Sequence, residues 1–273
     1  MTAAAERWAL VLGCSSGTGA GIARALARDP GLHVFGFHRG NFPAEARVLE
    51  DELRALGRKV VFRLADAGTA NGALEGAAAL RETAGPASVA FMVHALSGAS
   101  VGRFLSTRER AGFHPRQFEK TFNYLAHSFA YWARALHEGG LLAPGARLLG
   151  LTNMLHDSLV DAAGLIAASK AALEMYVRYF ALELGPLGHR VNLLKFGTVP
   201  SPALARVFGP AAMARLEAQA RDLIPAGRLC TFEDVGRVVS YLARPESEWF
   251  NGATIDFSGG MALHLLEIVT RSG

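Results

Sequence analysis

Short apolar runs alternate with longer segments of helical periodicity along the whole chain. A short apolar run between polar or glycine-containing segments is typical of a strand that is buried on both faces of a sheet. The runs span residues 8–12, 32–37, 60–64, 88–93, 147–151, 190–196 and 253–257. Strands that alternate with helices predict a parallel sheet, because parallel neighbours need crossover connections. We therefore expect a single doubly wound α/β domain over residues 1–273, with seven parallel strands and helices on both faces.

Two of the intervening segments carry clear helix signals. Thr231 followed by Asp234 predicts a helix start, because the threonine oxygen can accept an orphan amide and the acid suits the positive end of the helix dipole. The long segment 162–187 is also predicted to be helical and to carry Lys170 on one face. No linker or internal repeat divides the chain, which favours one domain over two.

Composition and charge narrow the class of protein. The chain has 273 residues, of which 51% are hydrophobic and 19% charged, so a disordered chain is excluded. Its only two cysteines, Cys14 and Cys230, lie far apart, and no Cys/His spacing resembles a zinc site. We expect a reducing compartment, no disulfide framework and no metal.

The distribution of charged and apolar residues indicates where the protein acts. Lys and Arg number 28 against 24 Asp and Glu, a small surplus without the clustered basic patches of a nucleic-acid surface. No apolar stretch approaches the roughly 18 to 20 residues that span a bilayer. The amino terminus lacks the pattern of a secretory signal. We expect a soluble, cytoplasmic protein that binds neither nucleic acid nor membranes.

A glycine-rich turn follows the first predicted strand directly and precedes a predicted helix. Glycines allow unusual backbone angles and close approach of a ligand, while a helix terminus offers free amides to a pyrophosphate. The residues of this turn predicted to contact a cofactor are Gly13, Ser15, Ser16, Gly17 and Gly19.

Six separated features occur in the order found in one known family. They are the spacing of Gly13, Gly17 and Gly19; Asp66 after the third strand; Val93-His94-Ala95 at the place of Asn-Ala-Gly; Asn123; Ala168-Ser169-Lys170-Ala171-Ala172; and Arg190-Val191-Asn192 followed by Gly197. With these features the chain resembles the short-chain dehydrogenase/reductase family over nearly its whole length. Within that family it is most similar to the divergent enoyl-acyl-carrier-protein reductases, through Val177-Arg178-Tyr179, Gly185-Pro186, Phe232-Glu233-Asp234-Val235-Gly236, Asn251-Gly252 and Ser258-Gly259-Gly260.

The resemblance implies a Rossmann-type fold, a nicotinamide cofactor and a homodimer or homotetramer. Asp66 is implied to contact the adenine and Lys170 the ribose. The other cofactor contacts implied by the resemblance are His94, Ala95, Gly197, Thr198 and Val199.

The end of the second strand bears on the choice of nicotinamide cofactor. An acidic residue there favours the free ribose 2′-hydroxyl of NAD(H), whereas a cationic residue accommodates the 2′-phosphate of NADP(H). The sequence reads Phe37-His38-Arg39, so Arg39 favours NADP(H), with NAD(H) as the alternative. The competing interpretation is that Arg39 is only a solvated loop residue.

The family's proton-donating tyrosine is missing. It stands four residues before the active-site Lys in most members and seven before it in the enoyl reductases, and these positions here are Ile166 and Ala163. Neither side chain transfers a proton, although the anion formed by hydride delivery must be neutralised. We therefore hypothesise that Lys170 acts directly or through a water linked to Asn123; the alternative is that Lys170 only anchors ribose.

The remaining polar groups of the expected site give secondary candidates. Thr152 and Asn153 map near the family's serine and near an additional tyrosine of the enoyl reductases. His156, oriented by Asp157 or Asp161, is a titrating candidate, although loops carry such residues for solvation alone. Further interpretations assign Cys14 to a small buried position and Tyr124 and Tyr131 to the core.

Three classes of function follow, and the sequence leaves them open. The first is an NADP(H)-dependent oxidoreductase that reduces a carbonyl or conjugated C=C bond of a hydrophobic small molecule. The second is a non-redox cyclase, dehydratase or isomerase, and the third a cofactor-binding pseudoenzyme. The segment from about 200 to 228 is expected to form an apolar substrate lid, although its apolar residues equally suit ordinary helix packing.

Overall fold

Seven strands form one parallel sheet in the computed structural model, which describes residues 6–154, 159–201, 204–205 and 209–264. The strands are β1 (Trp8–Leu12), β2 (His33–His38), β3 (Val60–Leu64), β4 (Val89–His94), β5 (Leu142–Thr152), β6 (Arg190–Phe196) and β7 (Thr254–Phe257). Their spatial order is β3-β2-β1-β4-β5-β6-β7, and every neighbouring pair is parallel. The predicted doubly wound sheet is confirmed, and its chain order reverses between β1 and β4. Ligands of such sheets bind at this switch point, beyond the carboxyl ends of the strands.

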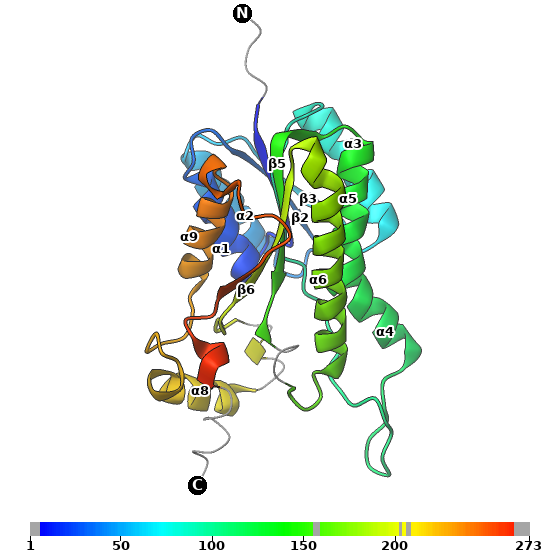
Figure 1. The fold of residues 1–273 in the computed structure, drawn as a ribbon, viewed down its shortest axis with the longest axis vertical. Helices are drawn as coiled ribbons and strands as arrows, with labels where there is room; N and C mark the ends of the chain where they lie inside the picture. Colours follow the sequence, from blue (N-terminus) through cyan, green and yellow to red (C-terminus); the bar gives the residue numbers. More distant parts are fainter. Residues whose placement is uncertain (1–5, 155–158, 202–203, 206–208, 265–273) are drawn as a thin grey trace, which may run out of the picture.

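Helices cover both faces of the sheet (Figure 1). The helices are α1 (Gly17–Ala27), α2 (Pro43–Ala55), α3 (Ala70–Ala84), α4 (Pro115–Phe122), α5 (Ser128–Glu138), α6 (Gly164–Leu184), α8 (Pro210–Leu223) and α9 (Phe232–Leu242). Short helical segments are the π-helix η1 (Asn123–His127) and the 3-10 turns η3 (Gly185–Leu187), η4 (Pro245–Ser247) and η5 (Met261–His264). Helices α3, α5 and α6 lie on one face and α1, α2 and α9 on the other, so each face of the sheet buries its own apolar cluster (Figure 1).

The predicted helix start at Thr231 is confirmed in detail. Thr231 caps α9, since its hydroxyl accepts a hydrogen bond from the Asp234 amide and the Asp234 carboxylate accepts one from the Thr231 amide. Such a capping box satisfies two orphan donors of the first turn. Helix α9 then packs closely on α1, where a Cβ on Gly21 would lie 2.8 Å from Phe232. This contact fixes the helix whose amino terminus carries the glycine-rich turn.

Trp132 on α5 fixes the opposite side of the switch point. Its ring is fully buried, lies 4.9 Å from the Phe37 ring and donates a hydrogen bond from Nε1 to the Ala67 carbonyl at 2.9 Å. A Cβ on Gly76 of α3 would lie only 2.3 Å from the indole. The carboxyl ends of β2 and β3 are therefore held against the helix that follows Asn123.

The segment predicted as the lid contains α8, which lies beyond the carboxyl ends of the strands at the lower end of Figure 1. Part of its apolar surface packs in a small separate cluster, in which Met154 and Met261 contact Ala220, Ile224 and Leu229. Ordinary packing therefore accounts for Ala220 and Ile224 of the predicted lid, and the role of the segment as a lid stays a prediction. None of the helices described in the structure is long and apolar enough to cross a membrane.

Candidate active site

The glycine-rich turn connects β1 to α1 and is shaped by steric limits. Gly13 has a φ of +90°, and a Cβ added to it would lie 2.8 Å from the Ala95 carbonyl oxygen. A Cβ on Gly19 would lie 1.9 Å from the Gly13 carbonyl oxygen. The Gly13 and Cys14 amides both donate to the Phe37 carbonyl, which ties the turn to the end of β2. Only glycine fits at positions 13 and 19, because backbone atoms occupy the space that a side chain would need.

The amino terminus of α1 has the features of an anion site. Ser16 is its N-cap but makes no capping hydrogen bond with its side chain, and the first turn carries no acidic residue. First-turn amides and the helix dipole together favour a bound anion. These features are compatible with the predicted binding of a dinucleotide pyrophosphate beside Ser15, Ser16 and Gly17, and those contacts stay a prediction.

Cys14 is a packing residue, as its sequence context suggested. Its side chain is fully buried, and a Cβ on Gly36 of β2 would lie 2.5 Å from its sulfur. Burial raises the pKa of the Cys14 thiol to about 12. The thiol therefore stays protonated near neutral pH and supplies no nucleophile.

A cluster of three side chains lies where β2, β3 and the α4–η1 helix meet. The Tyr124 hydroxyl donates to Asp66 Oδ2 at 2.5 Å, and the Gly68 amide donates to Asp66 Oδ1 at 3.0 Å. The Arg39 guanidinium carbon lies 4.3 Å from the centre of the Tyr124 ring. The structure thus brings together Arg39 and Asp66, both predicted cofactor contacts, on either side of Tyr124, which the sequence assigned to the core.

His94, at the end of β4, turns its side chain into the protein. Its Nε2 lies 2.7 Å from Ser128 Oγ, and its ring packs edge-on to Phe129 on α5. Burial, followed by the charge of Lys170, lowers the pKa of His94 to about 3. The imidazole is therefore neutral near pH 7, and its complete burial leaves the backbone of His94 and Ala95 as the part that can contact a cofactor.

Lys170 is the buried cation of the site. It lies on α6 with only 7% of its surface exposed, and its Nζ donates to the Leu151 carbonyl at the end of β5 at 2.6 Å. Burial lowers the pKa of Lys170 to about 8, because an ammonium loses hydration inside the protein. Ile166 and Ala163, at the two tyrosine positions of the family, are both buried and apolar. A group with a pKa of about 8 can give up a proton near neutral pH, which neither neighbour can do.

The other predicted catalytic residues differ in how firmly they are held. Thr152 is buried at the end of β5, and its hydroxyl donates a long hydrogen bond of 3.5 Å to the Asn153 carbonyl. Asn153 follows at a half-buried position. Asn123 is the first residue of the π-helix η1, and such π-turns concentrate at functional sites.

The loop candidates that the sequence suggested are only partly described by the structure. His156 and Asp157 lie outside the described residues, while Asp161 is exposed and paired with Arg103 at 2.8 Å.

The turn after β6 carries the last predicted contacts. Gly197 has its amide bonded to the Phe257 carbonyl at 3.3 Å, and a Cβ there would lie 3.0 Å from the Ser258 carbonyl oxygen. The Thr198 hydroxyl faces the Met261 sulfur at 3.6 Å, and Val199 is buried. The backbone of this turn therefore lies at the same edge of the sheet as Lys170, while the Thr198 side chain is engaged with η5.

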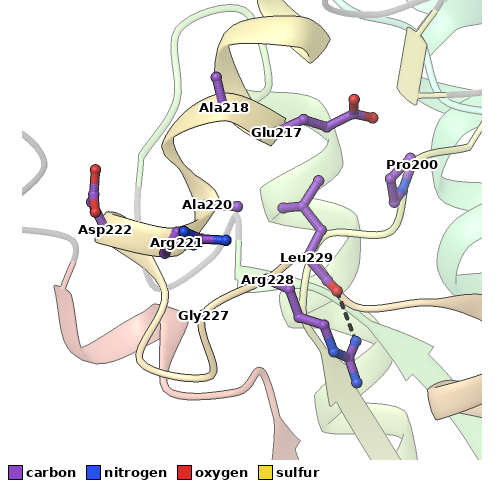
Figure 2. Close-up of a pocket in the computed structure, with 9 residues that line it drawn as sticks. All are labelled: Pro200, Glu217, Ala218, Ala220, Arg221, Asp222, Gly227, Arg228 and Leu229. Atoms are coloured by element: carbon purple, nitrogen blue, oxygen red, sulfur yellow. Dashed lines mark hydrogen bonds between the residues drawn. The ribbon is translucent and has the colours of Figure 1, made fainter.

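A pocket of about 440 Å³ lies beside α8 (Figure 2). Glu217 and Arg221 come from α8 and Pro200 from the turn after β6, while the Arg228 side chain folds back to the Leu229 carbonyl (Figure 2). Among the residues that the structure describes, the predicted catalytic side chains do not line this pocket. It belongs to the predicted lid and is separate from the Lys170 site.

The doubly wound sheet, the glycine turn before α1 and the buried lysine beside β5 together define a Rossmann-type α/β protein with an anion cradle at its switch point. A family model described as Enoyl-(Acyl carrier protein) reductase matches residues 13–262. The chain belongs to the short-chain dehydrogenase/reductase family of oxidoreductases.

Relatives of known name agree with this family. Dehydrogenase OXI1 of Cochliobolus heterostrophus is 35% identical over 124 residues, which make up 45% of this chain and 53% of that protein, so the chain matches about half the length of this relative. Hydroxynaphthalene reductase-like protein Arp2 of Metarhizium brunneum is 29% identical over 94% of this chain and 95% of its own length. A short chain dehydrogenase from Burkholderia cenocepacia in complex with NADP is 26% identical, covers 94% of this chain and 98% of its own, and has a TM-score of 0.77.

Sequence reasoning missed two features of the site. Tyr124 is buried, as predicted, but its hydroxyl and ring also connect Asp66 with Arg39. His94 buries its side chain against α5. The position of Tyr124 directly after Asn123 was the available sequence signal. No hydrophobic periodicity predicts the π-helix that contains Asn123 and Tyr124.

Proposed function

We propose that this protein is an NADP(H)-dependent oxidoreductase that reduces a carbonyl or conjugated C=C bond of a hydrophobic small molecule without a catalytic tyrosine. The observation that carries the proposal is Lys170, a buried ammonium with a pKa of about 8 held at the carboxyl end of β5. The glycine cradle before α1 supports a dinucleotide, and Arg39 at the end of β2 supports a 2′-phosphate. When bound, the nicotinamide would supply the hydride.

Residues of the chain itself would position and donate the proton that the reduction requires. The Leu151 carbonyl fixes the position of the Lys170 ammonium, and burial brings its pKa close to the working pH, where general acids are most effective. Conjugation in an electron-poor substrate spreads the developing negative charge, so the reduction needs less assistance from an acid. Asn123, Thr152 and Asn153 are proposed to orient the substrate or a water molecule beside Lys170.

Cofactor titration tests this proposal without knowledge of the substrate. Purified protein is titrated with NADPH and with NADH while nicotinamide fluorescence and thermal stability are followed together. A ligand that binds the folded state raises the melting temperature by mass action. We expect tight binding of NADPH and weaker binding of NADH, followed by NADPH oxidation with some members of a panel of ketones and enones.

Two other results of the titration would favour the alternative classes of function. Absence of binding of either nucleotide near millimolar concentration contradicts the proposal and favours cofactor-free cyclase, dehydratase or isomerase chemistry. Tight binding without oxidation on any substrate indicates a cofactor-binding pseudoenzyme.

We also propose that the protein is a homodimer or homotetramer that associates through α6. Met175 and Tyr179 on this helix are 49% and 59% exposed, whereas Tyr176 and Phe180 pack partly against the core. Large exposed apolar side chains in a row mark an association surface. Sedimentation velocity is expected to show a dimer or tetramer for the wild-type protein and dissociation for the pair Met175→Glu and Tyr179→Glu. A monomeric wild-type protein contradicts the proposal.

A further inference from the structure

Tyr124 is wedged between two backbone segments at the carboxyl edge of the sheet. A Cβ on Gly68 would lie 2.4 Å from the ring, and one on Gly98 would lie 2.9 Å from it. The hydroxyl is anchored on Asp66 Oδ2 at 2.5 Å, and 7% of the residue is exposed. The position of the ring is therefore restricted, because the backbone at Gly68 and Gly98 lies close to it and Asp66 anchors its hydroxyl.

The Arg39 guanidinium lies over this ring. Its guanidinium carbon is 4.3 Å from the ring centre, the geometry of a cation–π contact, and its Nη2 donates to the Ser97 carbonyl at 3.4 Å. Within the described chain Arg39 forms no ion pair, and the residue is exposed. Most of its N–H groups thus stay available to a ligand although its side chain is held in place.

Among the residues that the structure describes, no ion pair joins Asp66 to Arg39. Tyr124 donates to one carboxylate oxygen and the Gly68 amide to the other, so both oxygens accept hydrogen bonds from the protein itself. An arginine that is fixed on an aromatic face loses less side-chain freedom when it binds a phosphate than a mobile one does. Such pre-organisation raises affinity for the phosphate without adding any contact to it.

We infer that Tyr124 is a positioning residue that sets the preference for a 2′-phosphorylated cofactor by holding Arg39 in its phosphate-binding orientation. This inference rests on the proposed function, because it assumes that a nicotinamide dinucleotide binds at the switch point. The inference assigns the preference for NADPH to the contact between Arg39, which follows β2, and Tyr124 of η1, instead of to the Arg39 charge alone.

The test compares dissociation constants for NADPH and NADH, measured by nicotinamide fluorescence, across matched variants. Tyr124→Leu removes the ring, and we expect about a tenfold weaker affinity for NADPH with NADH changed less than about twofold. Tyr124→Phe keeps the ring and should keep most of the preference. Tyr131→Leu removes a half-buried tyrosine that does not contact Arg39 and serves as the control. Adding Arg39→Ala to Tyr124→Leu should cause little further loss, since two residues that act as a unit are not additive.

Arg39→Lys provides a second test at an exposed position, where folding is not at risk. Lysine keeps the charge but lacks the planar group that stacks, so the preference for NADPH should fall nearly as far as in Arg39→Ala. Full retention of the preference in Arg39→Lys, or an equal loss of NADPH and NADH affinity in Tyr124→Leu, overturns the inference and leaves the proposed function standing. Failure of the wild-type protein to bind either nucleotide overturns both.

Discussion

Replacing Lys170 with methionine is expected to lower turnover of a reducible ketone or enone by about 10²- to 10⁴-fold, the range that a positioned proton donor contributes. Methionine fills a similar volume but carries no proton, and the buried neighbours Ile166 and Ala163 supply none. The measurement is the turnover number at saturating NADPH, with the dissociation constant of NADPH determined separately. Lys59→Met, which removes an exposed lysine paired with Glu6, is the control and should leave turnover unchanged.

The two roles considered for Lys170 separate in this experiment. Loss of turnover with little change in NADPH affinity identifies Lys170 as the donor, whereas weaker binding with preserved turnover at saturation identifies it as a ribose anchor. Unchanged turnover and unchanged binding would refute both roles.

The pH dependence of the wild-type enzyme follows from the same group. Burial lowers the pKa of Lys170 to about 8, and the ammonium is the form that donates. The rate of reduction should therefore be level below about pH 8 and decline above it, as the fraction of protonated Lys170 falls. The methionine variant should lack this decline.

Folding stability provides an independent check on the burial of Lys170. Because its pKa is lower in the folded than in the unfolded chain, the unfolded chain binds more protons between about pH 8 and the ordinary lysine range. The free energy of unfolding of the wild-type protein should therefore rise with pH across that window. At pH 7 the Lys170→Met variant should be more stable by about 1 to 3 kcal/mol, since about 1.4 kcal/mol accompanies each pKa unit and part is offset by the lost hydrogen bond.

The strands could be predicted because a buried parallel strand is a local pattern. Its apolar run is set by burial on both faces, and turn residues bound it without reference to the rest of the chain. Strand β5 shows the limit of this reasoning, since it begins at Leu142 instead of residue 147. Pro144 and Gly145 interrupt the apolar pattern, and they fall where the pairing register shifts from Val89–Leu142 to Phe91–Arg147. A bulge of this kind hides the start of a strand from sequence reasoning.

The backbone geometry of the glycine turn could be predicted from the sequence, whereas the contacts of side chains with several possible partners could not. Gly13 and Gly19 follow from the strand-turn-helix context, because steric limits at the turn are local. The contact of Tyr124 with Asp66 joins residues 58 positions apart and depends on a π-turn. His94 buries its imidazole because Ser128 on α5 offers a partner. Neither choice is encoded in the few residues around it, so only the three-dimensional structure reveals them.

Replacing Gly19 with alanine is expected to weaken cofactor binding strongly. The added Cβ would lie 1.9 Å from the Gly13 carbonyl oxygen, and no rotamer change relieves a clash between backbone atoms. The turn would have to open, which moves the first-turn amides of α1 away from the pyrophosphate. A hydrogen bond to a charged group contributes about 1.5 to 3 kcal/mol, so loss of one or two of them weakens binding by about 100-fold. We therefore expect NADPH affinity to fall by about that factor, with a loss of the thermal shift that NADPH causes.

Gly57→Ala is the matched control for this prediction. Gly57 follows α2 at a φ of +76° with no atom within 4 Å of an added Cβ, so alanine there causes backbone strain without a clash. It should cost about 1 kcal/mol of stability and leave NADPH affinity unchanged. The comparison separates the general cost of losing a glycine from the specific loss of the phosphate cradle. If Gly19→Ala binds NADPH as tightly as the wild-type protein, the turn before α1 is not the pyrophosphate site, and the cofactor role of every residue assigned around it has to be reconsidered.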